Sequence, residues 1–287
     1  FSTVFFYIIS INSLSVSAEL VKNKINEFSK ETALAISNFA KNNFENMKYL
    51  EFDIQIQEKL KPSFSIMSVT ELLKIDSGTV FNQTSLNTHD NDETVNIGFG
   101  YRKLLNDNKI LIGSNIFYDH QFDLDHKRTG AGLEAISSIF DLRGNYYNAL
   151  SGSKITSDGS ERALDGWDTQ LDYHLPGEKD VNIFANLFAF ENPDSASTYE
   201  EKGTKFGANA SLGNFTIEGG YLNDNQNNDA FFGSVKFVVK LGDNGDKKKQ
   251  NFLEYTDVSD KLYQPVKREN KIRVVKISKS GVTVGGF

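Results

Sequence analysis

The main feature of this chain is a long series of segments in which apolar and polar residues alternate. From Val95 to Arg102, every odd-numbered residue is apolar or aromatic, and every even-numbered residue is small, an amide or a cation. This period of two is typical of β-strands, whose successive side chains point to opposite faces. A soluble sandwich would also alternate, but here many long strands carry aromatic residues near their ends and follow a secretion-signal pattern. The combination favours a barrel that is apolar outside and polar inside, as in bacterial outer-membrane proteins.

The alternation also marks where the strands lie. It begins at Tyr49, after which Leu50 and Phe52 share one face while Glu51 and Asp53 share the other. Bacterial single-chain barrels have an even number of strands. We predict an all-β fold, a twelve-stranded antiparallel transmembrane β-barrel over residues 48–241, with a short N-terminal helix and a C-terminal linker. The expected strands are 48–58, 62–72, 78–85, 93–105, 109–119, 128–137, 139–151, 161–175, 180–191, 202–212, 215–223 and 229–241.

The connections between these segments fall into two groups. Most even-numbered strands are followed by tight turns, at 106–108, 138, 176–179 and 213–214. The odd-numbered strands from the third onward are followed by longer polar connections, at 86–92, 120–127, 152–160, 192–201 and 224–228. Outer-membrane barrels have short periplasmic turns and longer external loops. We therefore expect the twelfth strand to end in the periplasm, on the same side as the N-terminus.

The N-terminal residues have the pattern of a secretory leader. An apolar core from Val4 to Ile9 precedes the small-x-small sequence that ends at Ala18. We expect residues 1–18 to be a signal peptide that lacks its basic n-region, with a buried strand or helix start as the alternative. Residues 19–47 carry apolar residues at a spacing of three to four, which predicts a periplasmic helical lead-in.

The character of the chain changes again after the last predicted strand. Asp243 to Lys249 is a polar turn and linker, Pro265 interrupts the stretch that follows, and Ile272 to Ile277 alternates like a strand. Roughly ten extended residues suffice to cross the hydrocarbon core of a bilayer. We expect residues 242–287 to be a linker or tail that threads the pore, with the passenger absent or truncated.

Composition narrows the functional classes. The net charge of −7 argues against nucleic acid as a partner, because nucleic-acid binding selects basic surfaces. The absence of cysteine excludes disulfides, thiolate metal sites and cysteine nucleophiles. A mean hydropathy of −0.40 fits strands that are half polar and indicates no helical membrane span. We expect contact with outer-membrane lipid and no cofactor.

Charged residues on the predicted inward face indicate a wet interior that is partly salt-bridged. They are Arg102, Asp119, Arg128, Glu134, Arg143, Arg162, Asp168, Asp172, Lys205, Glu218 and Lys236. The candidates for shaping the pore and contacting the linker are Arg102, Asn115, Arg128, Glu134, Arg143 and Asn145. We expect no catalysis, and therefore no catalytic or metal-binding residues.

Two patterns that resemble chemical sites are weak. Histidines and carboxylates that are able to bind divalent cations gather on one predicted loop, at Asp119, His120, Asp123, Asp125 and His126. Ser151 and Lys154 have the Ser-x-x-Lys spacing of acyl-enzyme hydrolases, but they lie at a strand end without the helix that would orient them. We interpret the first as a solvated loop and the second as a chance match.

Several motifs together resemble the β-domain of inverse autotransporters, the intimin and invasin group. They lie at 96–102, 113–119, 126–134 and 142–152, and residues 266–272 resemble the segment that follows the barrel in that group. The resemblance covers roughly Ala40 to Ile277. It implies a barrel whose pore passes a C-terminal passenger to the cell surface (type Ve secretion). The family's usual passenger is a chain of immunoglobulin-like domains with an adhesive tip, and this sequence has no room for one such domain of ~100 residues.

The resemblance implies an outer-membrane translocator that exports or anchors its own C-terminal segment at the cell surface, with a link to adhesion. The implied partners are the barrel assembly machinery, periplasmic chaperones and the chain's own tail in the pore, while the surface ligand stays unknown. The alternative is a passive, porin-like channel or a structural outer-membrane barrel without a passenger. A third possibility is a soluble secreted β-sandwich, which the two groups of connections disfavour.

Overall fold

The structure is a computed structural model that describes residues 31–35, 37–40, 42–44, 46–89, 92–177, 180–241, 254–279 and 283–286. The expected signal peptide and the first part of the expected linker, residues 242–253, lie outside this set. Residues 31–35, 37–40 and 42–43 are helical and precede the first strand. Within the described residues, no helix has the length and apolar character needed to cross a bilayer.

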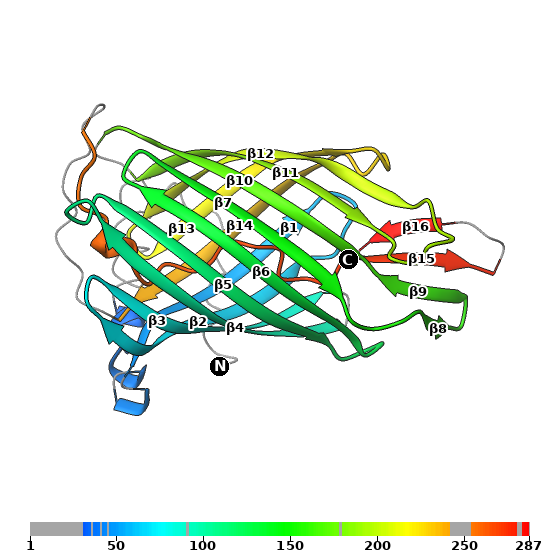
Figure 1. Ribbon diagram of the computed structural model, residues 1–287, viewed down its shortest axis with the longest axis horizontal. Coiled ribbons are helices and arrows are strands. Elements are labelled where there is room, and N and C mark those ends of the chain that lie inside the picture. The colour runs from blue at the N-terminus through cyan, green and yellow to red at the C-terminus, as the bar shows by residue number, and fades with distance from the viewer. Residues whose placement is uncertain are drawn as a thin grey trace, which may run out of the picture.

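Twelve antiparallel strands form one closed barrel, which confirms the predicted fold (Figure 1). The barrel closes where β1 pairs with β14, from Tyr49 opposite Lys240 to Gln57 opposite Phe232. Its strands are β1 (Met47–Gln57), β2 (Ser63–Ile75), β3 (Gly78–His89), β4 (Asp92–Leu105), β5 (Ile110–Gln121), β6 (His126–Ser137), β7 (Phe140–Ala149), β10 (Asp165–Leu175), β11 (Val181–Glu191), β12 (Glu200–Leu212), β13 (Phe215–Asp224) and β14 (Ala230–Lys240).

The connections differ between the two ends of the barrel. At one end, which we call the turn end, they are 76–77, 106–109, 138–139, 176–180 and 213–214. At the other, the loop end, they include 58–62, 122–125, 150–164, 192–199 and 225–229. The predicted long connection at 86–92 is wrong, because β3 continues to His89 and β4 starts at Asp92.

A second, smaller sheet lies at the loop end (Figure 1). Its strand order is β16-β15-β9-β8, from strands β8 (Lys154–Thr156), β9 (Gly159–Ala163), β15 (Val274–Ser278) and β16 (Thr283–Gly286). The single strand predicted at 161–175 is therefore two, because the chain changes sheets at Leu164. Arg162 was predicted to face the lumen but belongs to this second sheet, where its Nε lies 3.1 Å from Asp194 Oδ1.

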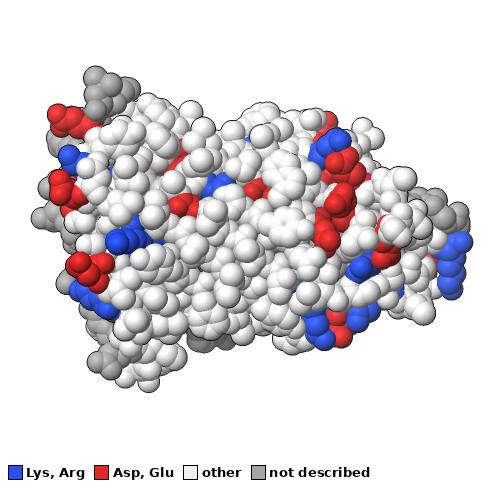
Figure 2. Space-filling view, in the orientation of Figure 1, with Lys and Arg blue, Asp and Glu red and all other residues white. Residues whose placement is uncertain are grey.

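Burial on the barrel wall is the reverse of that in a soluble protein. On β4, Ile97, Phe99 and Tyr101 are 40–50% exposed, whereas Asn96 and Arg102 are fully buried. Figure 2 shows most charged residues of the visible face near the two ends, with a broad, mostly uncharged band between them. An exposed apolar band between charged ends is the surface that a bilayer covers. The alternation that predicted the strands therefore separates a lipid-facing side from a polar lumen.

A lysine on the lipid face should destabilise the barrel according to its depth. Phe99→Lys, in the middle of β4, is expected to lower the free energy of unfolding by about 2–4 kcal/mol, because the ammonium loses its hydration in hydrocarbon. Leu105→Lys lies on the same face at the strand end and is expected to cost about 0–1 kcal/mol. Urea unfolding of the protein in lipid vesicles measures both changes. Equal losses would contradict the assignment of the lipid-facing side.

Candidate functional site

The lumen of the barrel contains an unusual number of buried charged side chains. Arg102, Arg128 and Arg143 are among the largest fully buried side chains of the described residues. Burying an unpaired charge is very costly, so each of these guanidinium groups needs acceptors. The wall supplies some of them: Arg102 pairs with Glu134, and the Nε of Arg128 lies 2.8 Å from Asp119 Oδ2.

Residues 254–279, which we call the tail, run through this lumen from one end to the other (Figure 1). At the turn end, the Val258 amide donates to the carbonyl of Asn108, at 2.8 Å. Midway, Gln83 of β3 brackets the Val266 peptide, accepting from its amide at 2.7 Å and donating to its carbonyl at 3.3 Å. At the loop end, the Lys279 amide donates to the carbonyl of Asp158 at 2.9 Å. At these three points, polar groups of the tail backbone are satisfied by hydrogen bonds to other parts of the chain.

Near the turn end, Lys261 fixes the tail. Its Nζ donates to the carbonyl of Ser137 at 2.6 Å and lies 3.1 Å from Asp141 Oδ1 and 2.8 Å from His174 Nε2. Val258 packs beside it in a small apolar cluster with residues of β4, β5 and β6. This part of the tail therefore combines a partly buried ammonium with apolar packing.

Arg102 holds the next part of the tail. Its Nη1 donates to two tail carbonyls, those of Leu262, at 2.9 Å, and Gln264. Its Nη2 lies 3.2 Å from Glu134 Oε2, and its Cζ lies 4.6 Å from the ring of Phe81. One guanidinium thus joins a wall carboxylate to the tail backbone.

In the middle of the lumen, Arg268 of the tail makes a two-pronged contact with the wall. Its Nη1 and Nη2 donate to the two oxygens of Asp119 at 2.8 and 2.7 Å, a two-pronged arrangement that is specific to arginine. The guanidinium also lies 4.2 Å from the ring of Phe117 and 5.4 Å from the ring of Tyr147. A Cβ at Gly98 would overlap the Phe117 ring, so glycine is what allows that ring to lie flat against β4. We call Arg268, Asp119, Phe117 and Tyr147 the arginine clamp.

Beyond the arginine clamp, the tail is bound on several sides. The Glu269 amide donates to Tyr147 Oη at 2.7 Å, and its carbonyl accepts from Arg128 Nη2 at 2.6 Å. Arg273 is buried, pairs with Glu201 of β12, and lies 4.6 and 4.8 Å from the rings of Phe188 and Phe190.

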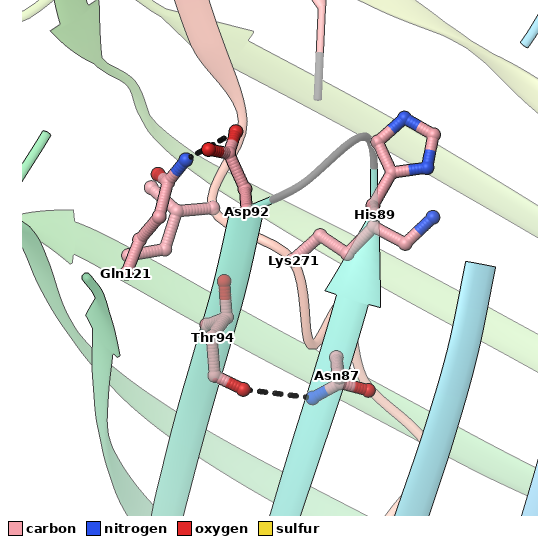
Figure 3. A pocket seen from close by; sticks show the side chains of 7 residues that line it. Asn87, His89, Asp92, Thr94, Gln121 and Lys271 are labelled. Atoms are coloured by element: carbon pink, nitrogen blue, oxygen red, sulfur yellow. Dashed lines mark hydrogen bonds between the residues drawn. The ribbon is translucent and has the colours of Figure 1, made fainter. Parts of the chain in front are cut away.

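The tail also completes the wall at the loop end. Lys271 and Ile272 line a small pocket together with strand residues from β3, β4 and β5 (Figure 3). The strand residues are Asn87, His89, Asp92, Thr94 and Gln121. Within it, Gln121 Nε2 donates to Asp92 Oδ2 at 3.0 Å. The tail thus supplies two of the seven residues that line this pocket.

The structure places the six candidate residues as follows. Arg102, Arg128 and Asn145 contact the tail directly, the last by donating from its Nδ2 to the Lys267 carbonyl at 3.1 Å. Glu134 reaches the tail through Arg102, and Arg143 through Asp172, which lies 2.6 Å from Arg143 and 2.7 Å from Lys267. Asn115 is buried on β5, opposite Gly132 of β6.

Sequence reasoning missed the tail side of this site. It did not single out Gln83, Lys261 or Arg268, although Arg268 lies in the segment that resembles the post-barrel region. A usable signal was the run of charges at 267–269, because charged residues in an extended segment entering a polar lumen need partners there.

The two weak patterns have other roles. Asp119 and His126 are buried, Asp119 with the arginines and His126 with its Nδ1 3.1 Å from Ser151 Oγ. His120 and Lys154 instead contact the exposed Asp125, at 2.8 and 3.4 Å. Lys154 is therefore directed to a carboxylate, and in the described part of the chain no group of three or more histidines and carboxylates is arranged to hold a metal ion.

Comparison with known proteins adds a family and a fold. The family model described as "Inverse autotransporter, beta-domain" matches residues 8–270. A stretch of 170 residues, 56% of this chain, is 28% identical to intimin from Escherichia coli O127:H6 (strain E2348/69 / EPEC), of which it covers 18%. A stretch of 100 residues, 33% of this chain, is 30% identical to the inverse autotransporter adhesin YeeJ of E. coli K12, of which it covers 4%. The chain thus spans a small part of these relatives.

Solved structures show the same fold. A chain from work on the in-meso crystallization of membrane proteins aligns with a TM-score of 0.66 and 20% identity, over 79% of this chain and 98% of its own length. An outer membrane channel from Pseudomonas putida F1 aligns with a TM-score of 0.52 and 10% identity, over 68% of this chain and 95% of its own length.

Removing the Arg268 side chain should loosen the tail in the lumen. Arg268→Ala leaves Asp119 with only part of its compensating charge, and loss of one partner from a buried pair costs about 3–5 kcal/mol. We expect lower stability and a higher ion conductance in planar bilayers than in the wild type, with Arg268→Lys intermediate because it keeps the charge but loses the two-pronged geometry. Lys279→Ala, at an exposed position of the tail, is the control. Equal conductance in Arg268→Ala and Lys279→Ala would contradict this role of Arg268.

Proposed function

This chain belongs to the inverse autotransporter β-domain family, and from that premise we propose that it is a translocator barrel that exports its own C-terminal segment and anchors it at the cell surface. The observation that carries the proposal is the tail inside the lumen, which contacts the turn end through Val258 and the loop end through Lys279. The tail continues into β15 of the sheet at the loop end. A chain in this position has one part inside the pore and a following part beyond it.

The lumen has the chemistry that such a path requires. An extended chain exposes amide and carbonyl groups at every residue, and a polar wall can bind them in place of water. Arg102, Gln83 and Asn145 do so by binding the tail backbone. We infer that these residues, with Arg128, Glu134, Arg143 and Asn115, shape the path and hold the tail at the end of export.

The protein is a bacterial outer-membrane barrel whose apolar exterior contacts lipid. We propose that the turn end faces the periplasm, because outer-membrane barrels have short periplasmic turns. The helical residues before β1 and the end of β14 then lie on the periplasmic side, and the second sheet lies outside the cell. Assembly by the barrel assembly machinery, with periplasmic chaperones, is part of the same proposal. This function requires no catalytic step.

A link to adhesion follows from the relatives. YeeJ is described as an inverse autotransporter adhesin. Because this chain covers only a small part of that protein and of intimin, we assign to it the anchoring part of such a role. The surface ligand would be bound by exported chain, since the barrel itself is embedded in lipid.

The proposal predicts where the end of the chain lies. With an epitope tag after Phe287 and expression of the chain behind a functional secretion signal in a Gram-negative host, the tag should be bound by antibody and cut by added protease on intact cells. The physical reason is that the tail passes through the lumen that the closed wall surrounds and emerges at the loop end. A second tag at 213–214, in a turn-end connection, should become accessible only after the outer membrane is opened.

The opposite result for the terminal tag would favour a different function. If the barrel is inserted but the terminal tag is reached only after the outer membrane is broken, the chain is a channel or structural barrel without export. Insertion is judged by heat-modifiable migration in gels, which is independent of the tag.

A further inference from the structure

We propose that the connection between β7 and β10 retains the exported chain, and we call this connection the catch. Its hairpin, β8–β9, pairs with the emerging tail as a new strand and thereby prevents the tail from returning into the lumen. The inference rests on the proposed export function and deepens it by assigning to this loop the site that holds the exported segment. It concerns residues 150–164 on the loop side and residues 272–279 on the tail side.

The first observation is that β9 has two edges and the tail occupies one of them. On one edge, β9 pairs with β8, from Lys154 opposite Glu161 to Thr156 opposite Gly159. On the other edge it pairs with β15, from Ala163 opposite Val274 to Gly159 opposite Ser278. Without the tail, this edge would present unpaired backbone donors and acceptors at the loop end of the barrel. Such an edge is a site for strand addition by an extended chain.

The second observation is that the hairpin is held in place by contacts that do not involve the tail. Arg162 is 3.1 Å from Asp194, in the connection between β11 and β12, and also donates to the carbonyl of Ser151. Ser151 Oγ in turn lies 3.1 Å from His126 Nδ1 at the start of β6. The open edge of β9 is therefore positioned before the tail arrives, which lowers the entropic cost of capturing it.

The third observation is that the tail fits closely against the root of the hairpin. Ala163 and Leu164 are fully buried, and Val275 of the tail joins Leu164 in an apolar cluster with residues of the barrel wall. The Leu164 amide donates to the Arg273 carbonyl at 3.0 Å. Burial of these side chains stabilises the captured state and is absent while the tail is still sliding.

The fourth observation is a charge match between the hairpin and the tail. Lys276 Nζ lies 3.4 Å from Glu161 Oε2. Burial by itself would raise the pKa of Glu161, but the neighbouring His126 ring and the Lys276 ammonium outweigh this and hold the pKa below its usual range. The carboxylate is thus kept charged for the lysine of the tail.

Gly159 determines how closely β15 can approach. A Cβ at this position would overlap the carbonyl oxygen of Ile277, whereas a Cβ at Gly152, in the same connection, would meet open space. Both positions lie outside the barrel strands. Gly159→Val should therefore disrupt the pairing of β9 with β15, and Gly152→Val is its matched control.

The pairing itself can be measured by a disulfide. The chain has no cysteine, so Glu161→Cys with Lys276→Cys introduces a single pair at directly opposed positions. We expect oxidation to cross-link this pair in the otherwise wild-type chain and in Gly152→Val, and to fail in Gly159→Val. The pair Glu161→Cys with Ser278→Cys, two residues out of register, should form little cross-link. A cross-link that persists in Gly159→Val would overturn the assigned geometry.

The catch is tested on intact cells with the full chain and a tag after Phe287. Surface tags are marked with a membrane-impermeant reagent, and protease is added after a delay. In the wild type and Gly152→Val, marked tags should stay open to protease. In Gly159→Val, fewer tags should reach the surface, and a several-fold larger fraction of those marked should become protected.

The outcomes separate the catch from the export function. If tags are absent from the surface in the wild type, the translocator proposal fails. If Gly159→Val loses the cross-link yet exposes and retains its tag as Gly152→Val does, export stands and the catch is wrong.

Discussion

Burying arginine inside a membrane barrel is tolerable only when every guanidinium group has acceptors, and this requirement organises the lumen. The wall provides carboxylates for Arg102 and Arg128, namely Glu134 and Asp119, but both arginines also donate to carbonyl oxygens of the tail. In the opposite direction, Arg268 of the tail binds Asp119 of the wall. Because the desolvation cost of each charge is met partly by the other component, wall and tail form one polar unit.

The strands were predictable because two different surroundings act on every one of them. Lipid on one side and a polar lumen on the other enforce strict alternation, which identified twelve barrel strands and the inward face that carries the six candidate residues. The prediction was wrong where that pressure is absent. Between Gly159 and Ala163 the chain has left the barrel, and the adjacent buried residues Ala163 and Leu164 interrupt the alternation where it changes sheets. The polar residues at 86–92 suggested a loop, but residues 86–89 belong to β3 and Asp92 begins β4.

The partners of the tail could not be predicted from local sequence. Arg102 and the carbonyl of Gln264 are 162 residues apart, and Arg128 and the carbonyl of Glu269 are 141 apart. Which pairs meet depends on how far the tail has advanced through the lumen, and this is set by its contacts at both ends, Lys261 at the turn end and β15 at the loop end. The charged run at 267–269 indicates that partners exist, but the register that selects them is a property of the assembled barrel.

The closure between β1 and β14 has a consequence for the order of assembly. The tail is enclosed by a continuous ring of twelve strands, and it is fixed to structure at both ends, so it cannot enter sideways once the ring has closed. Its residues, however, are synthesised after every strand that surrounds them. Either the ring stays open until the tail is inside, or the tail is threaded lengthwise as a folded-back loop. In both cases the part of the chain that is synthesised last completes the molecule. A stall in chain synthesis or delivery therefore leaves a ring in which Arg102 and Arg128 lack the carbonyl acceptors that the tail supplies.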